Sequence, residues 1–249
     1  MWLRRLLVTW QGVVLTLVAV VITIVLAVNG QLGLYIHPRY FVFTIIMAVI
    51  GLAFVVGGLL HRGHDDSEKT SRRQLVLSVV GMLVLAVLTT AMIVVPPSTL
   101  TTATVEQRDI NSGGISSEAD TADAALLAGA GDFDRLTLKD WASLLTQTTD
   151  PSFFDGKTAK LSGFISPAPS DPEDIFYIAR FVVTCCAVDA QPIGVPVYLE
   201  DWDDTFDADQ WVEATGGFET NPSAASADPL VVVPTTLEPI DEPNDPYVY

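Results

Sequence analysis

The stretch TAKLSGFI, residues 158–165, alternates apolar and polar side chains before it reaches a glycine. Ala159 and Leu161 fall on one face, as they do in a strand that buries one side. A second stretch, WVEATGGF at residues 211–218, repeats the pattern with a glycine at the same place. A glycine inside a strand is typical of a bulge or a sharp bend. The pair predicts two bent strands of one small β domain.

Further stretches of the same kind surround these two, and short turns rich in Gly, Pro and Asp separate them. The five predicted strands cover residues 157–166, 174–184, 195–200, 210–219 and 230–240. Several short strands with such turns indicate an all-β domain. Five strands, of which the first and the fourth contain a bending glycine, resemble the OB-fold. We therefore expect a small OB-like five-stranded β-barrel.

A helical pattern precedes the predicted strands. Thr137 stands three residues before Asp140, the spacing of a capping box at the start of a helix. Trp141 and Leu144 continue an apolar face at helical spacing, and Pro151 stops it. We expect one amphipathic helix packed against the β domain.

The N-terminal part of the chain contains three long uncharged stretches, at residues 6–28, 40–60 and 75–95. Each has about the 20 apolar residues that cross a bilayer, and a spanning segment of this kind must be helical. We expect three transmembrane helices in contact with the lipid bilayer. No stretch contains an ionisable residue, and such residues usually mark ion or substrate paths. This part is therefore predicted to be an anchor or a subunit, not a transporter by itself.

Charge divides the chain in two. Residues 1–95 hold seven Lys and Arg and three Asp and Glu, whereas residues 96–249 hold six Lys and Arg and 27 Asp and Glu. The second part has a net charge of -21 and repels phosphate backbones, so we expect no nucleic-acid partner. The predicted organisation is a transmembrane domain over 1–97, a flexible linker over 98–131 with one short helix near 118–129, and an acidic domain over 132–249.

The distribution of basic residues predicts an orientation. The loop at residues 61–74 carries four Lys and Arg, whereas the loop at residues 29–39 carries only Arg39. Basic loops stay on the cytoplasmic side. The N-terminus is therefore predicted to be cytoplasmic, and the acidic domain extracytoplasmic, in a multi-pass protein of the cell membrane.

The chain has two cysteines, Cys185 and Cys186, and they are adjacent. Neighbouring side chains of a strand point to opposite faces, so a bond between them requires a turn. Four fates stay open: a vicinal disulfide, an intermolecular bond, a metal or ligand site, or one thiol in the core and one at the surface. Asp189 is a nearby oxygen donor for a ligand site.

The predicted acidic domain contains no histidine, because all three histidines lie before residue 65. It therefore cannot form an ordinary zinc site or a Ser–His–Asp set alone, and we expect no enzyme. His37 lies in the predicted outer loop, so it is the histidine that a shared ligand site would use. Whether a metal binds stays open.

Several stretches resemble the YcgQ-like family of bacterial membrane proteins. They are YIHPRY (35–40), GKTAKLSGFI (156–165), IARFVVTCCAVDAQPIGVPV (178–197), DQWVEATGGF (209–218) and the terminal DPYVY (245–249). The resemblance implies an accessory subunit of a membrane permease, with a multi-span permease protein as its partner and a link to metal homeostasis. The residues themselves favour an alternative: an extracytoplasmic protein that senses redox state or metal through Cys185 and Cys186.

Overall fold

The computed structural model describes residues 2–61, 76–77, 79–81, 83–84, 87, 99–112, 118–148 and 150–249. The chain divides into two compact units, Met1–Ser98 and Thr99–Tyr249. Each unit is described by itself below.

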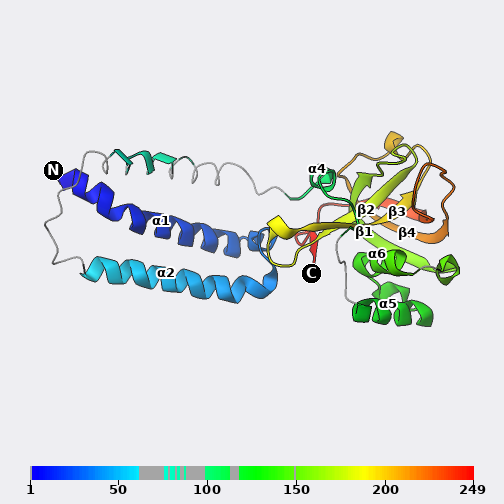
Figure 1. Cartoon of the computed structure of the whole chain (residues 1–249), viewed down its shortest axis with the longest axis horizontal. Coiled ribbons are helices and arrows are strands. Elements are labelled where there is room, and N and C mark those ends of the chain that lie inside the picture. Colours follow the sequence, from blue (N-terminus) through cyan, green and yellow to red (C-terminus); the bar gives the residue numbers. More distant parts are fainter. Residues whose placement is uncertain are drawn as a thin grey trace. The chain divides into compact units, whose positions relative to one another are not determined.

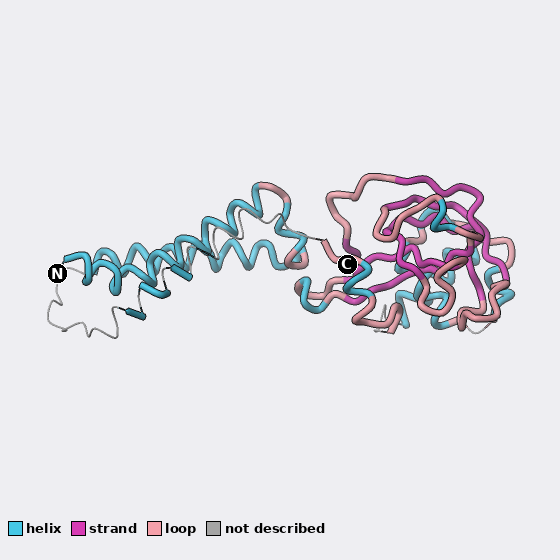
Figure 2. Tube along the Cα trace, turned by 90° about the horizontal axis from the view of Figure 1, so that it is seen from above, coloured by secondary structure: helices cyan, strands magenta, loops and turns pink. Residues whose placement is uncertain are grey.

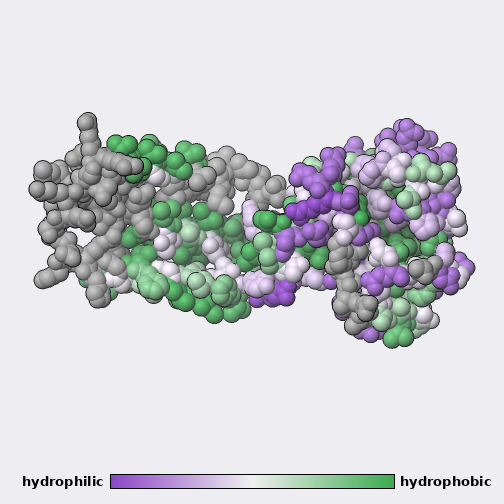
Figure 3. Space-filling view, viewed as in Figure 1, coloured by the Kyte–Doolittle hydropathy of each residue, from purple (hydrophilic) through white to green (hydrophobic). Residues whose placement is uncertain are grey.

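The first unit contains two long helices, α1 (Trp2–Val28) and α2 (Phe41–His61), joined through the short 3-10 helices η1 (Gln31–Leu34) and η2 (Pro38–Tyr40). Along α2 most apolar side chains are exposed, among them Val42 at 69% and Phe54 at 78%. Figure 3 shows hydrophobic residues over the described parts of both helices. A surface this apolar requires lipid or a partner to cover it.

The prediction of three transmembrane helices was wrong. Among the described residues, one helix, Pro38–Gly57, is long and apolar enough to cross a membrane, and a shorter apolar helix covers Val13–Val28. The stretch predicted as the third span, residues 75–95, lies mostly outside the described residues. The prediction counted uncharged residues, and this count does not establish how long a continuous apolar helix is.

The second unit is built on a six-stranded mixed sheet (Figure 1). Its strands are β1 (Thr158–Pro167), β2 (Ile175–Val182), β3 (Gln191–Tyr198), β4 (Trp211–Thr220), β5 (Leu230–Pro239) and β6 (Tyr247–Val248). The strand order is β1-β4-β5-β3-β2-β6, and β1 also pairs with β2. Two pairings are parallel, β2 with β6 and β3 with β5.

This mixed sheet corrects the predicted fold, a five-stranded OB-like β-barrel. The five predicted strands are present, each within a few residues of its expected position, but a sixth strand joins the sheet. β6 has only two residues, which is too short to show an alternating pattern. The parallel contact of β3 with β5 is a single pair, Val197 with Val232, and no local turn signals it.

Helices cover the sheet and close the core. They are α4 (Thr102–Val105), α5 (Glu118–Ala130) and α6 (Leu138–Gln147). Figure 1 shows α5 beside α6, and Figure 2 shows the strands of this unit with helical segments beside them. The predicted capping box is present, with the Thr137 amide donating to the Asp140 carboxylate at 2.8 Å. Trp141 is completely buried, and its ring centroid lies 4.9 Å from that of Phe218 on β4. α6 therefore contributes the largest side chain of the core.

The stretch predicted as a flexible linker, residues 98–131, contains α4, which was not predicted, and α5, which matches the short helix predicted near 118–129. Ala124 and Ala128 of α5 are buried in the same core as α6. Its sequence is poor in large apolar residues, so burial here uses alanine faces that the sequence pattern does not reveal.

The two glycines of the repeated stretch lie where the backbones approach most closely. A Cβ on Gly163 would collide with the carbonyl oxygen of Ala179 on β2. A Cβ on Gly216 would collide with the carbonyl oxygen of Val233 and lie 2.9 Å from Cα of Pro234. The register of β4 against β5 shifts between Thr215 and Gly216, so the predicted bulge is present at the second glycine.

Candidate functional site

The two cysteines lie in the connection between β2 and β3. β2 ends at Val182, and the chain then bends before the short 3-10 helix η5 (Ala187–Asp189). Cys185 is exposed and Cys186 is partly exposed, so neither thiol belongs to the core. This excludes the arrangement in which one thiol is packed in the core and the other lies at the surface.

The bend places the two sulfur atoms close together. Sγ of Cys185 lies 3.6 Å from Sγ of Cys186, and both cysteines are free thiols. In an extended strand the two side chains would point to opposite faces. Both cysteines lie beyond the end of β2, at a bend at residues 184 and 185, and the bend brings the two thiols together.

Asp189 organises the bend. Its carboxylate accepts the amides of Thr184 at 3.2 Å, Cys185 at 2.8 Å and Cys186 at 3.4 Å. The amide of Asp189 donates in turn to the carbonyl of Cys186 at 2.9 Å, and the Cys186 side chain caps η5. One carboxylate thus holds three successive amides, which makes the shape of the loop depend on residue 189.

The same carboxylate controls the acidity of the first thiol. Hydrogen bonding to Asp189, and next to Cys186, raises the pKa of Cys185 to about 12. Partial burial acts to raise the pKa of Asp189, but hydrogen bonds from the Cys185 thiol and the loop amides outweigh it and lower that pKa. At neutral pH the reduced loop therefore holds a protonated Cys185 beside a charged Asp189, and a protonated thiol is a poor nucleophile.

The segment that follows α4 holds this loop and the strand after it. The guanidinium of Arg108 donates to the carbonyl oxygens of Ala190 and, at 3.0 Å, of Val188. Asn111 exchanges two side-chain hydrogen bonds with Gly194, of 2.8 and 3.0 Å. Sequence reasoning missed both residues, because they lie some 80 positions away in a stretch that was predicted to be flexible.

Of the residues singled out from the sequence, Cys185, Cys186 and Asp189 come together in the second unit. His37 lies in the first unit, where its Nδ1 accepts the amide of Arg39 at 3.1 Å and caps η2. Within the described ranges, no group of three or more His, Cys, Asp and Glu is arranged to hold a metal ion.

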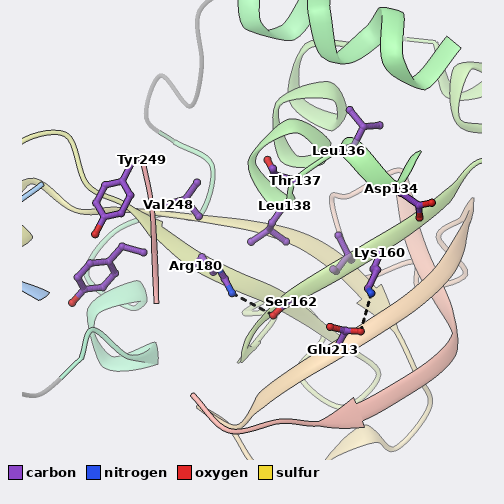
Figure 4. Close-up of a pocket in the computed structure, with 12 residues that line it drawn as sticks. Asp134, Leu136, Thr137, Leu138, Lys160, Ser162, Arg180, Glu213, Val248 and Tyr249 are labelled. Atoms are coloured by element: carbon purple, nitrogen blue, oxygen red, sulfur yellow. Dashed lines mark hydrogen bonds and ion pairs between the residues drawn. The ribbon is translucent and has the colours of Figure 1, made fainter. Parts of the chain in front are cut away.

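A second feature of the unit is a pocket of about 450 Å³ that the sequence did not indicate. It lies between the start of α6, strands β1 and β4, Arg180 of β2, and the C-terminal β6 (Figure 4). Lys160 and Glu213 form an ion pair of 3.2 Å on its wall, and Arg180 points toward Ser162. No pattern along the chain marks these residues, since they come from five separate segments.

Comparison with known protein families identifies the family of the second unit. A model of the DUF1980 C-terminal domain matches residues 119–249, which is slightly more than half of the chain. No curated protein and no solved structure matches the chain.

Proposed function

Since the chain belongs to the DUF1980 family by its C-terminal domain, we propose that this domain carries a thiol–disulfide switch at Cys185 and Cys186. The observation that carries the proposal is the 3.6 Å separation of the two sulfurs in an exposed loop. Adjacent thiols on one side of a bend need only a local change to bond, whereas thiols on opposite faces of a strand would need the strand to break.

The reaction is an exchange with a small-molecule disulfide. The thiolate of one cysteine attacks a sulfur of the disulfide, forms a mixed disulfide and releases one thiolate. The second cysteine then attacks the protein-bound sulfur, closes the Cys185–Cys186 bond and releases the second thiolate. The two protons lost by the cysteines go to the two released thiols. The protein is oxidised and the small disulfide is reduced, and excess thiol reverses both steps.

Oxidation would alter the loop around Asp189. In the reduced loop the Cys185 thiol is hydrogen-bonded to Asp189, and a disulfide has no thiol proton to donate. The loop carbonyls of Val188 and Ala190 are the acceptors of Arg108. A change in the shape of the loop would therefore act through Arg108 on the segment 99–112. This segment directly follows the first unit in the sequence.

Intact mass spectrometry of the full chain in detergent tests the switch. After incubation with oxidised glutathione we expect a monomer lighter by two hydrogen atoms, with no bound glutathione, and full recovery on addition of reductant. The Cys186→Ser variant should instead keep one glutathione. A wild-type product with a stable glutathione adduct, or a disulfide-linked dimer, would contradict an intramolecular bond. Zinc bound to the purified reduced protein would favour metal sensing instead.

A second candidate function is an accessory subunit of a membrane permease. The exposed apolar surface of α2, which needs lipid or a membrane partner, favours it, and so does the resemblance to YcgQ-like proteins. We propose that the protein lies in the cell membrane with its N-terminus in the cytoplasm and the acidic unit outside. The basic residues Arg4 and Arg5, at the N-terminal end of the chain, support this orientation.

One experiment tests both the side of the membrane on which the acidic unit lies and its contact with a multi-span protein. Val188 is 81% exposed, so Val188→Cys in a chain without other cysteines offers one accessible thiol. A membrane-impermeant maleimide that carries a photoreactive group should label this variant on whole cells. Illumination should then give an adduct with a multi-span protein. The variant without any cysteine is the control. Labelling only after lysis would refute the outside placement, and labelling without an adduct would count against the permease partner.

A further inference from the structure

The pocket beside β6 contains a cation with few partners. Among the described residues, the one hydrogen bond of the Arg180 side chain is that from Nη2 to Oγ of Ser162, at 3.3 Å, and no ion pair reaches its guanidinium. Its Nε is buried and has no hydrogen-bond partner. One face of the guanidinium lies over the ring of Trp211, with 5.2 Å to the ring centroid. Stacking fixes the plane of the guanidinium but satisfies none of its N–H groups.

The carboxylates around the pocket do not neutralise this cation. Glu213 is paired with Lys160, and the pair is about half exposed. The charge of Asp245 favours the protonated form of Arg180, while partial burial lowers the Arg180 pKa and is the larger effect. Asp245 itself accepts the hydroxyl of Tyr249 at 3.1 Å. Arg180 is partly buried and has no ion pair among the described residues, so an external anion would compensate the charge of its guanidinium.

The remaining groups of the pocket suit such an anion. The Ser162 oxygen accepts from Arg180, so its own proton is available to a ligand. Leu136, Leu161 and Val248 supply apolar wall. A volume of about 450 Å³ holds a small organic molecule.

We propose that this pocket binds a small molecule through an oxyanion group, which sits on the guanidinium of Arg180 and the hydroxyl of Ser162. The planar guanidinium presents parallel N–H groups that match two oxygens of a carboxylate or phosphate. The apolar wall would hold the body of the ligand, and β6 would close one side (Figure 4). This site is separate from the cysteine loop, and it does not depend on the proposed switch.

Calorimetric titration of the full chain in detergent tests the site with three probes: benzoate, inorganic phosphate, and benzamide as the uncharged analogue of benzoate. We expect saturable binding of benzoate or of phosphate, and none of benzamide. Binding of benzoate alone would indicate a ligand with a carboxylate and an apolar body. Binding of phosphate alone would indicate a ligand with a phosphate group. Binding of neither anion, or equal binding of benzamide, would overturn the proposal.

Two variants and a control locate the bound anion. Arg180→Met should weaken binding at least about tenfold, because it removes the charge and the paired donors. Ser162→Ala should weaken it less. Arg135→Met removes an exposed arginine that is paired with Asp132 and does not contact Arg180 or Ser162. This variant should leave binding unchanged. If Arg180→Met does not fold, the affinity of Ser162→Ala for the anion tests the proposal instead. Unchanged affinity in Ser162→Ala, or in a folded Arg180→Met, would refute the site.

Discussion

Replacing Gly216 by alanine should lower the free energy of unfolding by about 3 kcal/mol, the upper part of the usual range for an added methyl group in a packed interior. The new Cβ would collide with the carbonyl oxygen of Val233 and approach Cγ1 of Val232 at 2.8 Å. Both contacts lie on β5, which pairs with β4 along its whole length. Relief requires a backbone shift of the sheet, and a side-chain rotation alone cannot provide it. Urea unfolding of the full chain, followed by tryptophan fluorescence, measures the change.

The neighbouring glycine is the matched control. A Cβ on Gly217 would meet no atom nearer than 3.9 Å, the carbonyl oxygen of Lys157. Gly217→Ala should therefore change the unfolding free energy by less than about 1 kcal/mol. An equal loss of unfolding free energy in the two variants would show that the close carbonyl oxygen of Val233 is not the cause of the loss. Equal stability of both would contradict the tight packing of β4 against β5.

Replacing Asp189 by asparagine should make Cys185 more reactive. The pKa of Cys185 is raised to about 12, first by hydrogen bonding to Asp189, so little thiolate is present near pH 8 and reactivity rises as the pH approaches 12. Without the carboxylate the pKa falls toward its ordinary value, and the thiolate fraction near pH 8 increases. In a Cys186→Ser background we expect at least about a tenfold faster reaction with iodoacetamide. Mass spectrometry of quenched samples follows the rate.

The control for this experiment is Asp203→Asn, which removes an exposed carboxylate outside the cysteine loop. Its alkylation rate should match that of the parent. The pH profile separates a chemical effect from an unfolded loop. The Asp189→Asn profile should keep its shape but move to lower pH. An unchanged rate in Asp189→Asn would mean that the carboxylate does not hold the thiol proton, and this would remove the basis for its role in the switch.

Much of the second unit could be read from local patterns. Alternation placed five strands within a few residues, and Thr137 with Asp140 marked the start of α6. The glycine shared by the two similar stretches predicted a bulge, and the structure has one beside Gly216. These features succeed because each depends on residues within about ten positions of one another, so pleat, cap and bend are all visible along the chain.

The sites could be read only in part. Cys185, Cys186 and Asp189 were singled out together, but the sequence did not show that the Asp189 carboxylate accepts successive amides of the loop and holds it bent. Arg180 sits within β2 and looks from the sequence like an ordinary polar residue of a strand. Only the fold brings it to Ser162 and to β6, which begins at Tyr247.

The sequence by itself determined the division of charge, the apolar character of the first unit, and the positions of five strands and the capped helix. The tertiary structure alone decided the mixed sheet with its two-residue sixth strand, the contact of Arg108 with the cysteine loop and the pocket at Arg180. The physical reason is the separation along the sequence of the residues that each feature brings together. Periodicity and capping are properties of neighbours, whereas parallel pairing, loop closure and pocket formation join residues that the chain keeps tens of positions apart.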